Sequence, residues 1–220
     1  MGVTNYEIAI LNSIIEKGEH EIKTVIELGA QNNYTTQETG KPPFMSEWYS
    51  KKGISYDCID LAGDNNARKL DLSEVFDMGK TFDLVTDFGT SEHCVQMNEY
   101  VSVPFHGGFI NSIYPVGIPK DINLGYYNAW YNKHKMARVG GLVFSVNPMT
   151  NHWHGHGYTY LGEDFYKELV KISGYEILID EVNCAMGNCY DGKNVCALLL
   201  KTSDQFPSFN QFKNLPIYRS

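Results

Sequence analysis

Basic residues are in the minority in this sequence of 220 residues, which has 18 lysines and arginines against 26 aspartates and glutamates. The formal net charge at pH 7 is therefore −8. Surfaces that bind nucleic acid gain their affinity from clustered lysines and arginines, which neutralise phosphates. We therefore expect no nucleic acid among the partners of this protein.

Long apolar runs and paired cysteine motifs are also missing. No run approaches the length of about 20 residues that spans a bilayer, and residues 1–23 contain acidic side chains and no small-residue cleavage site. The cysteines are odd in number and form no CxxC pair, which favours reduced, buried thiols. They are Cys58, Cys94, Cys184, Cys189 and Cys196. We therefore expect a cytoplasmic protein with no membrane partner.

The sequence does contain a regular alternation of helix and strand patterns. Residues 5–17 carry apolar side chains at helical spacing, and residues 24–30 form a run rich in β-branched residues that reaches a glycine. Further strand-like runs lie at 55–61, 82–88, 141–146, 175–182 and 195–200. This alternation predicts a parallel sheet covered by helices on both faces. The length is sufficient for one domain with a sizeable core.

Two segments interrupt the alternation. Residues 99–127 are rich in glycine, proline, asparagine and aromatic side chains without a sustained period, and long irregular stretches within compact domains are usually functional loops or lids. Residues 203–220 carry phenylalanines among polar residues and prolines. We predict a lid-like insertion for the first segment and an irregular surface tail, anchored by its aromatic side chains, for the second.

Acidic and glycine residues stand where the first two strands end. The first strand ends with Glu27, Leu28, Gly29 and Ala30, and the second reaches Asp60. In open α/β sheets, ligands bind beyond the carboxyl ends of the strands, where an acidic side chain can accept hydrogen bonds from ribose hydroxyls. Dinucleotides and S-adenosylmethionine both suit such a site. Because the phosphate-binding GxGxxG pattern is absent, the phosphate-free S-adenosylmethionine is favoured.

The order of the motifs resembles that of class I S-adenosylmethionine-dependent methyltransferases. The motifs are ELG at 27–29, ID at 59–60, LDL at 70–72, FDLVTDFGTSEH at 82–93 and a glycine-led strand at 140–144. The resemblance implies a single methyltransferase domain over residues 1–220. It also implies a doubly wound α/β fold, a Rossmann-like and mostly parallel sheet of seven strands with the last strand antiparallel.

The resemblance also assigns roles to residues. Glu27 and Gly29 would lie beside the methionine part of S-adenosylmethionine, Asp60 would hold the ribose, and Asp71 would face the adenine. The segment that follows Asp87 would border the reacting methyl group. The full set of expected cofactor contacts is Glu27, Gly29, Ala30, Gln31, Asp60, Leu61, Asp71, Leu72, Asp87, Phe88 and Gly89.

One residue departs from the family pattern. Gln31 stands where these methyltransferases commonly have a glycine. A module that binds S-adenosylmethionine without turnover is therefore the alternative hypothesis, and a dinucleotide-dependent oxidoreductase is a third.

Histidines form the second group of candidate site residues. His152, His154 and His156 occupy alternate positions directly after a strand, and imidazole is a common metal ligand. No second group of ligands accompanies them at metal-site spacing, so we predict no metal and favour a loop that lines the acceptor pocket. His93, His154 and His156 are the candidate general bases. We expect O-methylation of a small-molecule or sugar-like acceptor.

Overall fold

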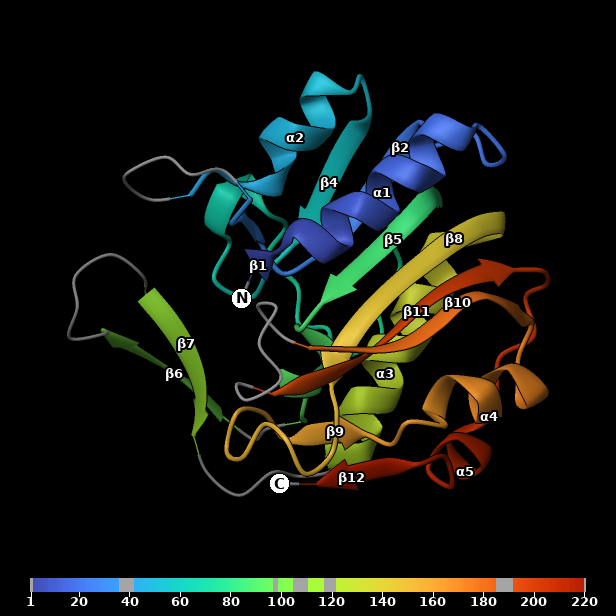
Figure 1. Ribbon diagram of the computed structural model, residues 1–220. Coiled ribbons are helices and arrows are strands. Elements are labelled where there is room, and N and C mark those ends of the chain that lie inside the picture. Colours follow the sequence, from blue (N-terminus) through green and yellow to red (C-terminus); the bar gives the residue numbers. More distant parts are fainter. Residues whose placement is uncertain are drawn as a thin grey trace.

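The computed structural model describes residues 2–35, 42–96, 99–104, 111–116, 122–184 and 192–219. Its centre is a six-stranded sheet of order β10-β11-β8-β5-β2-β4 (Figure 1). The strands are β2 (Thr24–Leu28), β4 (Ser55–Ile59), β5 (Phe82–Phe88), β8 (Ala137–Pro148), β10 (Tyr175–Cys184) and β11 (Lys193–Lys201). Neighbouring strands are parallel from β4 to β8, whereas β11 is antiparallel to both β8 and β10. The predicted mostly parallel α/β sheet with an antiparallel last strand is confirmed.

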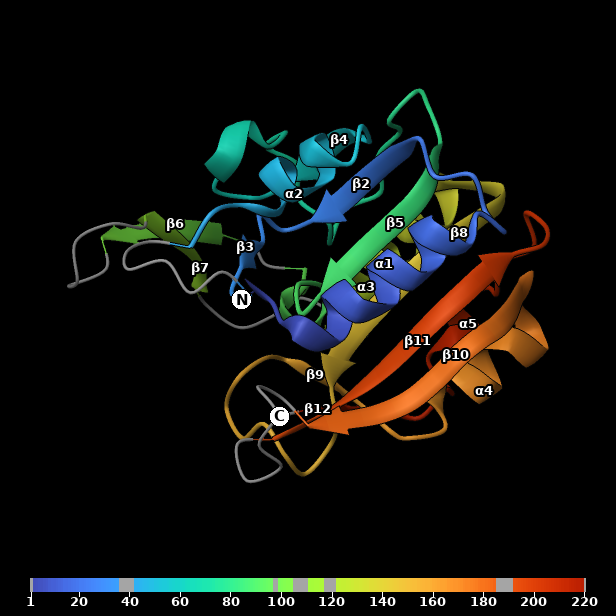
Figure 2. The same ribbon diagram turned by 45° about the horizontal axis from the view of Figure 1, so that its top comes forward.

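Helices cover both faces of this sheet (Figure 2). The helices α1 (Asn5–Lys17) and α2 (Met45–Lys51) pack on one face. The helices α3 (Ile122–Met136), α4 (Phe165–Ile172) and α5 (Phe209–Phe212) pack on the other. Successive side chains of a strand point to opposite faces. In β2, Val25 packs in the apolar cluster under α1 and α2, and Ile26 packs in the cluster under α3, α4 and α5. The central strand β2 is therefore apolar on both sides, as a doubly wound sheet requires.

The first helix has a complete start signal. The Thr4 side chain accepts a hydrogen bond from the backbone of the first turn, and the Thr4 backbone amide donates one to the Glu7 carboxylate. This capping box satisfies amide groups that have no partner within the helix. Gly18 ends the helix at φ 64°, a left-handed conformation that glycine adopts without steric cost.

The predicted number of seven strands is wrong for the described residues. Beyond β4, where another strand would extend the sheet, Arg68 pairs with Ile59 in a single parallel bridge. The chain then turns at Asp71, whose carboxylate accepts a hydrogen bond from the Ser73 amide. A turn so close to the bridge leaves no room for a longer ladder.

Small strand pairs lie outside the central sheet. Within residues 99–127, β6 (Glu99–Pro104) and β7 (Asn111–Val116) form an antiparallel hairpin beyond the carboxyl edge of the sheet (Figure 1), and α3 begins at Ile122. At the other end of the chain, β12 (Ile217–Arg219) pairs with β9 (Thr159–Leu161). The remaining pair joins β1 (Gly2–Val3) to β3 (Asn32–Asn33). Both segments that the sequence analysis expects to be irregular thus contain regular structure.

The cysteines are only partly as predicted. Cys58, Cys94 and Cys196 are free and buried, whereas Cys184, at the end of β10, is disulfide-bonded. The prediction of a reduced thiol is therefore wrong for Cys184, and Cys189 lies outside the described residues. Among the helices of the described ranges, none combines the length and apolar character needed to cross a bilayer.

Candidate active site

A cavity of about 410 Å³ opens at the carboxyl ends of β5 and β8, beside the start of α1. Phe88, Val146 and Pro148 give it apolar walls, while Glu92 and His156 contribute polar groups. A mostly apolar cavity with a few polar groups is typical of a site for a small organic ligand. Its place beyond the carboxyl ends of parallel strands is where open α/β sheets bind ligands.

Asp60 joins the loops that follow β2 and β4. One of its carboxylate oxygens accepts a hydrogen bond from the Ala30 amide at 3.1 Å, and the other accepts from the Ala62 and Gly63 amides. The side chain is only partly buried. Asp60 therefore organises both loops and keeps exposed surface at the carboxyl edge of the sheet, next to the half-buried Leu61.

Glu27 lies fully inside the protein. One carboxylate oxygen accepts hydrogen bonds from the Tyr56 hydroxyl at 2.7 Å and the Gln31 amide at 3.1 Å. The other oxygen has no hydrogen-bond partner among the described residues. Burial raises the pKa of Glu27 to about 8, so its carboxyl group is mainly protonated at neutral pH. Glu27, which was expected beside the methionine part of the cofactor, thus stabilises the turn after β2 from a fully buried position.

Side chains of this protein cover Gly29. The glycine has φ 75°, and a Cβ added to it would collide with Thr90 Oγ1 and approach Gln31 Nε2 to 2.9 Å. Gln31 donates hydrogen bonds to the Leu28 carbonyl and to Thr90 Oγ1, and Thr90 donates to the same carbonyl at 2.7 Å. Gln31 and Thr90 therefore occupy the space over the turn at Gly29, the glycine expected to lie beside the methionine part of the cofactor.

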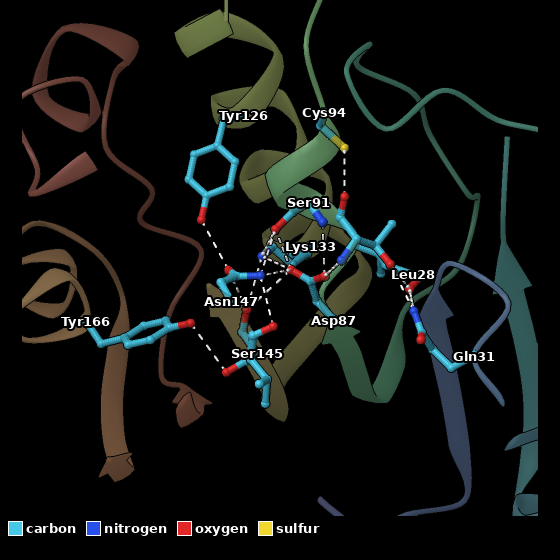
Figure 3. A network of polar contacts seen from close by, with 12 residues as sticks. Leu28, Gln31, Asp87, Ser91, Cys94, Tyr126, Lys133, Ser145, Asn147 and Tyr166 are labelled. Atoms are coloured by element: carbon cyan, nitrogen blue, oxygen red, sulfur yellow. Dashed lines mark hydrogen bonds and ion pairs between the residues drawn. The ribbon is translucent and has the colours of Figure 1, made fainter. Parts of the chain in front are cut away.

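Asp87 belongs to a buried network instead of a cavity wall (Figure 3). Its carboxylate is 2.7 Å from Lys133 Nζ, and both side chains are completely buried. It also accepts hydrogen bonds from the amides of Thr90 and Ser91. Burial by itself would raise the pKa of Asp87, but Lys133 and these hydrogen bonds lower it below the ordinary value. Asp87 therefore stabilises the turn after β5.

The turn after β5 places the next two expected cofactor residues at the cavity. Phe88 and Gly89 line the cavity, and Gly89 has φ 76°. The short helix η2 (Ser91–His93) follows directly. In the expected adenine segment, the Leu72 side chain is buried in the core, and the Leu72 carbonyl accepts a hydrogen bond from Asn132 of α3. Asp71 remains half-buried at the surface.

The candidate histidines divide into two groups. The rings of His93 and His156 lie 5.2 Å apart, although 63 residues of sequence separate them. Glu92 lies between them, with its carboxylate 3.6 Å from His93 and 3.8 Å from His156. Partial burial and the neighbouring His156 lower the pKa of His93 to about 4. His154, in contrast, is exposed and faces a separate surface pocket beside Arg219.

Comparison with known proteins establishes the fold. No family model and no curated protein sequence matches the chain. The 1,6-didemethyltoxoflavin-N1-methyltransferase of Burkholderia thailandensis superposes with a TM-score of 0.56 at 13% identity, over 90% of this chain and 78% of that one. The N-methyltransferase NodS of Bradyrhizobium japonicum WM9 gives 0.52 at 12% identity, over 92% and 96%. This chain has the methyltransferase fold.

A third methyltransferase supports the same arrangement. The structure of a putative sarcosine dimethylglycine methyltransferase from Galdieria sulphuraria superposes with a TM-score of 0.51 at 10% identity, over 90% of this chain and 86% of that one. At such identities the likeness extends to the fold alone.

Several residues of this methyltransferase fold escaped the sequence analysis. Thr90 and Lys133 were missed because their partners are far away in sequence, and Glu92 was not singled out from the motif at 82–93 that contains it. The sequence does give one sign that Lys133 is buried, because this lysine lies in an aromatic-rich helix. In the structure Trp130 of the same helix is also fully buried. A lysine in such surroundings needs a buried anion, and Asp87 supplies it.

Proposed function

We propose that this protein is an S-adenosylmethionine-dependent methyltransferase that acts on a small-molecule acceptor. The observation that carries the proposal is the cavity at the carboxyl ends of β5 and β8 in a methyltransferase fold, at the same edge of the sheet as the loops that Asp60 links. The Burkholderia structure contains bound 1,6-didemethyltoxoflavin and S-adenosylhomocysteine. The volume of the cavity in this chain, about 410 Å³, is suitable for a small organic ligand.

The chain's own residues fit the cofactor best at the adenosine end. Asp60, Leu61 and Asp71 are partly exposed at the ends of their loops, and the Asp60 carboxylate can accept hydrogen bonds from the ribose hydroxyls in addition to the backbone amides it already holds. At the methionine end, the side chains of Gln31 and Thr90 would make the contacts that bare glycine backbone makes elsewhere. When bound, the cofactor supplies an electrophilic methyl group.

The protein's part in methyl transfer is to position the acceptor and exclude water. Phe88, Val146 and Pro148 can hold an apolar acceptor body against the sheet edge. Glu92, His93 and His156 form the polar end, where the reacting group would lie and lose its proton. We propose O-methylation of a hydroxyl group for this reason, in a small-molecule or sugar-like acceptor. His154 takes no part in this proposal, because it is exposed at a separate surface pocket.

A module that binds S-adenosylmethionine without turnover is the second candidate function. One observation favours it, which is the covering of Gly29 by Thr90 and Gln31. In that case the site would bind the cofactor weakly and transfer no methyl group.

Calorimetric titration of the purified protein tests the proposal. S-adenosylmethionine and S-adenosylhomocysteine should bind and raise the melting temperature, because a ligand selective for the folded state stabilises it. Absence of binding by both compounds at about millimolar concentration, far above the affinity of a working cofactor site, would refute the methyltransferase proposal. Tighter binding of NADH would support an oxidoreductase, and binding without transfer to hydroxylated acceptors would support the second candidate.

A further inference from the structure

Three potential metal ligands meet at the polar end of the cavity. They are the Glu92 carboxylate and the imidazoles of His93 and His156, and one ligand atom from each lies within 4.8 Å of the other two. The three residues come from two separate segments, the helix η2 and the loop between β8 and β9. Their meeting is therefore a property of the fold and not of local sequence.

The Glu92 carboxyl group is the second observation that points to a ligand. Its residue is 1% exposed and lines the cavity. Neither of its side-chain oxygens has a hydrogen-bond partner in the part of the chain that the structure describes. A buried carboxyl group that makes no hydrogen bond costs free energy, and a bound cation would supply a partner for it.

The loop that brings His156 is fixed against Glu92. The Tyr158 amide donates a hydrogen bond to the Glu92 carbonyl at 3.0 Å, and the Tyr160 hydroxyl accepts from the His156 amide at 2.9 Å. Gly157 packs so closely that a Cβ added there would lie 3.0 Å from Glu92 Cγ. These contacts fix the backbone that carries His156 beside Glu92, as the structure around metal ligands commonly does.

We infer that Glu92, His93 and His156 bind a divalent transition-metal ion, of which Zn²⁺ is the representative. Two imidazole nitrogens and one carboxylate suit Zn²⁺ and its neighbours in the first transition row, whereas Mg²⁺ prefers oxygen ligands alone. Metal–ligand bonds of about 2.0–2.2 Å require the three groups to draw closer than they stand. His93 can turn for this, since its side chain is 43% exposed.

Three protein ligands leave a coordination position open, and the cavity is the space beside it. An acceptor hydroxyl that binds there would lose its proton to solvent more readily, because the cation stabilises the oxyanion. An oxygen lone pair would then form the bond to the methyl carbon, while the electrons of the broken C–S bond would remain on sulfur. This role rests on the proposed function, whereas metal binding itself does not.

Metal titration of the untagged protein, after dialysis against a chelator, tests the inference. Zn²⁺ should bind once per chain and raise the melting temperature, and Mg²⁺ should do neither. His93→Ala and His156→Ala should each weaken Zn²⁺ binding by at least about tenfold, the lower end of what even a supporting residue contributes. His154→Ala is the matched control, because it removes an exposed histidine of the same loop and should leave affinity unchanged.

Other outcomes would overturn the inference. They are absence of Zn²⁺ binding to the folded protein, or loss of binding in His154→Ala with retention in His93→Ala. Glu92→Gln, which keeps the shape of the side chain, should also weaken binding and guards against a variant that fails to fold. S-adenosylhomocysteine affinity measured on the metal-free protein separates the two proposals, because it can be normal while Zn²⁺ binding is absent.

Discussion

At the scale of single residues, Glu27 links stability to pH. Its pKa is about 8 in the folded protein because of burial, whereas an unfolded chain has the ordinary value near 4.3. The folded state therefore favours the protonated form. This contribution to stability is fully present below about pH 4.3 and is lost as the pH rises towards 8.

Replacement of Glu27 by glutamine should remove this pH dependence. The amide can still accept the hydrogen bonds from Tyr56 and Gln31 and cannot ionise. We expect Glu27→Gln to match the wild type near pH 4.5 and to exceed its free energy of unfolding by about 3–5 kcal/mol at pH 8. Urea unfolding at several pH values measures the difference. A constant difference at every pH would show that Glu27 does not titrate in this way.

Asp60 provides a second test at this scale. Asp60→Ala should weaken S-adenosylhomocysteine binding by about 1.5–3 kcal/mol, the range for hydrogen bonds to a charged group. It should also lower the melting temperature, because the Ala30, Ala62 and Gly63 amides lose their acceptor. Calorimetry and thermal unfolding measure the two effects separately.

Asp60→Asn is the control for that experiment. It retains one acceptor oxygen, so it should affect stability less than alanine does while still weakening binding. If Asp60→Ala binds S-adenosylhomocysteine as well as the wild type does, the acidic residue for the ribose has been misassigned, with Asp57 or Asp64 as the next candidates.

At the scale of elements, the turn after β5 depends on one buried ion pair. Lys133→Met should leave the Asp87 carboxylate buried without its cation and should lower the free energy of unfolding by about 3–5 kcal/mol. The double variant Asp87→Asn with Lys133→Met should recover part of this loss, because no uncompensated charge remains. Denaturant unfolding of the single and double variants measures the coupling. Additive losses would mean that the pair does not act as a unit.

Residues that act through distant partners were the hardest to predict. Asp87 stands at a strand end, where an acidic residue is typical of a ligand site, and only the position of Lys133 on α3 reveals the ion pair. Periodicity identified α1 with its bounds and located all six sheet strands, because burial on two faces leaves a plain apolar signal. It did not reveal the β6–β7 hairpin or the pairing of β12 with β9, which rest on contacts with other parts of the chain.

The site was predictable to a similar extent. The loops at the carboxyl edge of the sheet were predictable, since strand ends and glycines mark them in the sequence. The contact between Gln31 and Thr90 within these loops was not predictable, because 59 positions of sequence separate the two residues. The meeting of Glu92 with His156 depends on how the loop after β8 returns to η2, and no local pattern encodes that path.

At the scale of the whole molecule, the β6–β7 hairpin is the candidate lid. Within the described residues its two strands pair only with each other, and none of the expected cofactor residues lies in it. Replacing residues 99–116 with a short Gly-Ser linker should leave S-adenosylhomocysteine affinity within a few fold and abolish turnover of the acceptor. Calorimetry and a methyl-transfer assay measure the two effects.

The replacement must end before α3. Gly125 packs against the segment that precedes the hairpin, where an added Cβ would lie 2.6 Å from the Gln96 amide nitrogen. The particle mass in solution is the control, because exposed aromatic residues can also mark an interface. A change of oligomeric mass in the shortened protein would favour a contact between copies over a lid.

The antiparallel strand β11 also governs when the molecule can fold. It is the last strand of the central sheet along the chain, yet it lies between β8 and β10. During synthesis both of those strands emerge first, and each must wait with an unsatisfied edge until residues 193–201 leave the ribosome. Strands with open edges attract other chains. The central sheet can therefore complete its pairing only after β11 has been synthesised, and we expect the nascent chain to be most prone to aggregation just before β11 inserts.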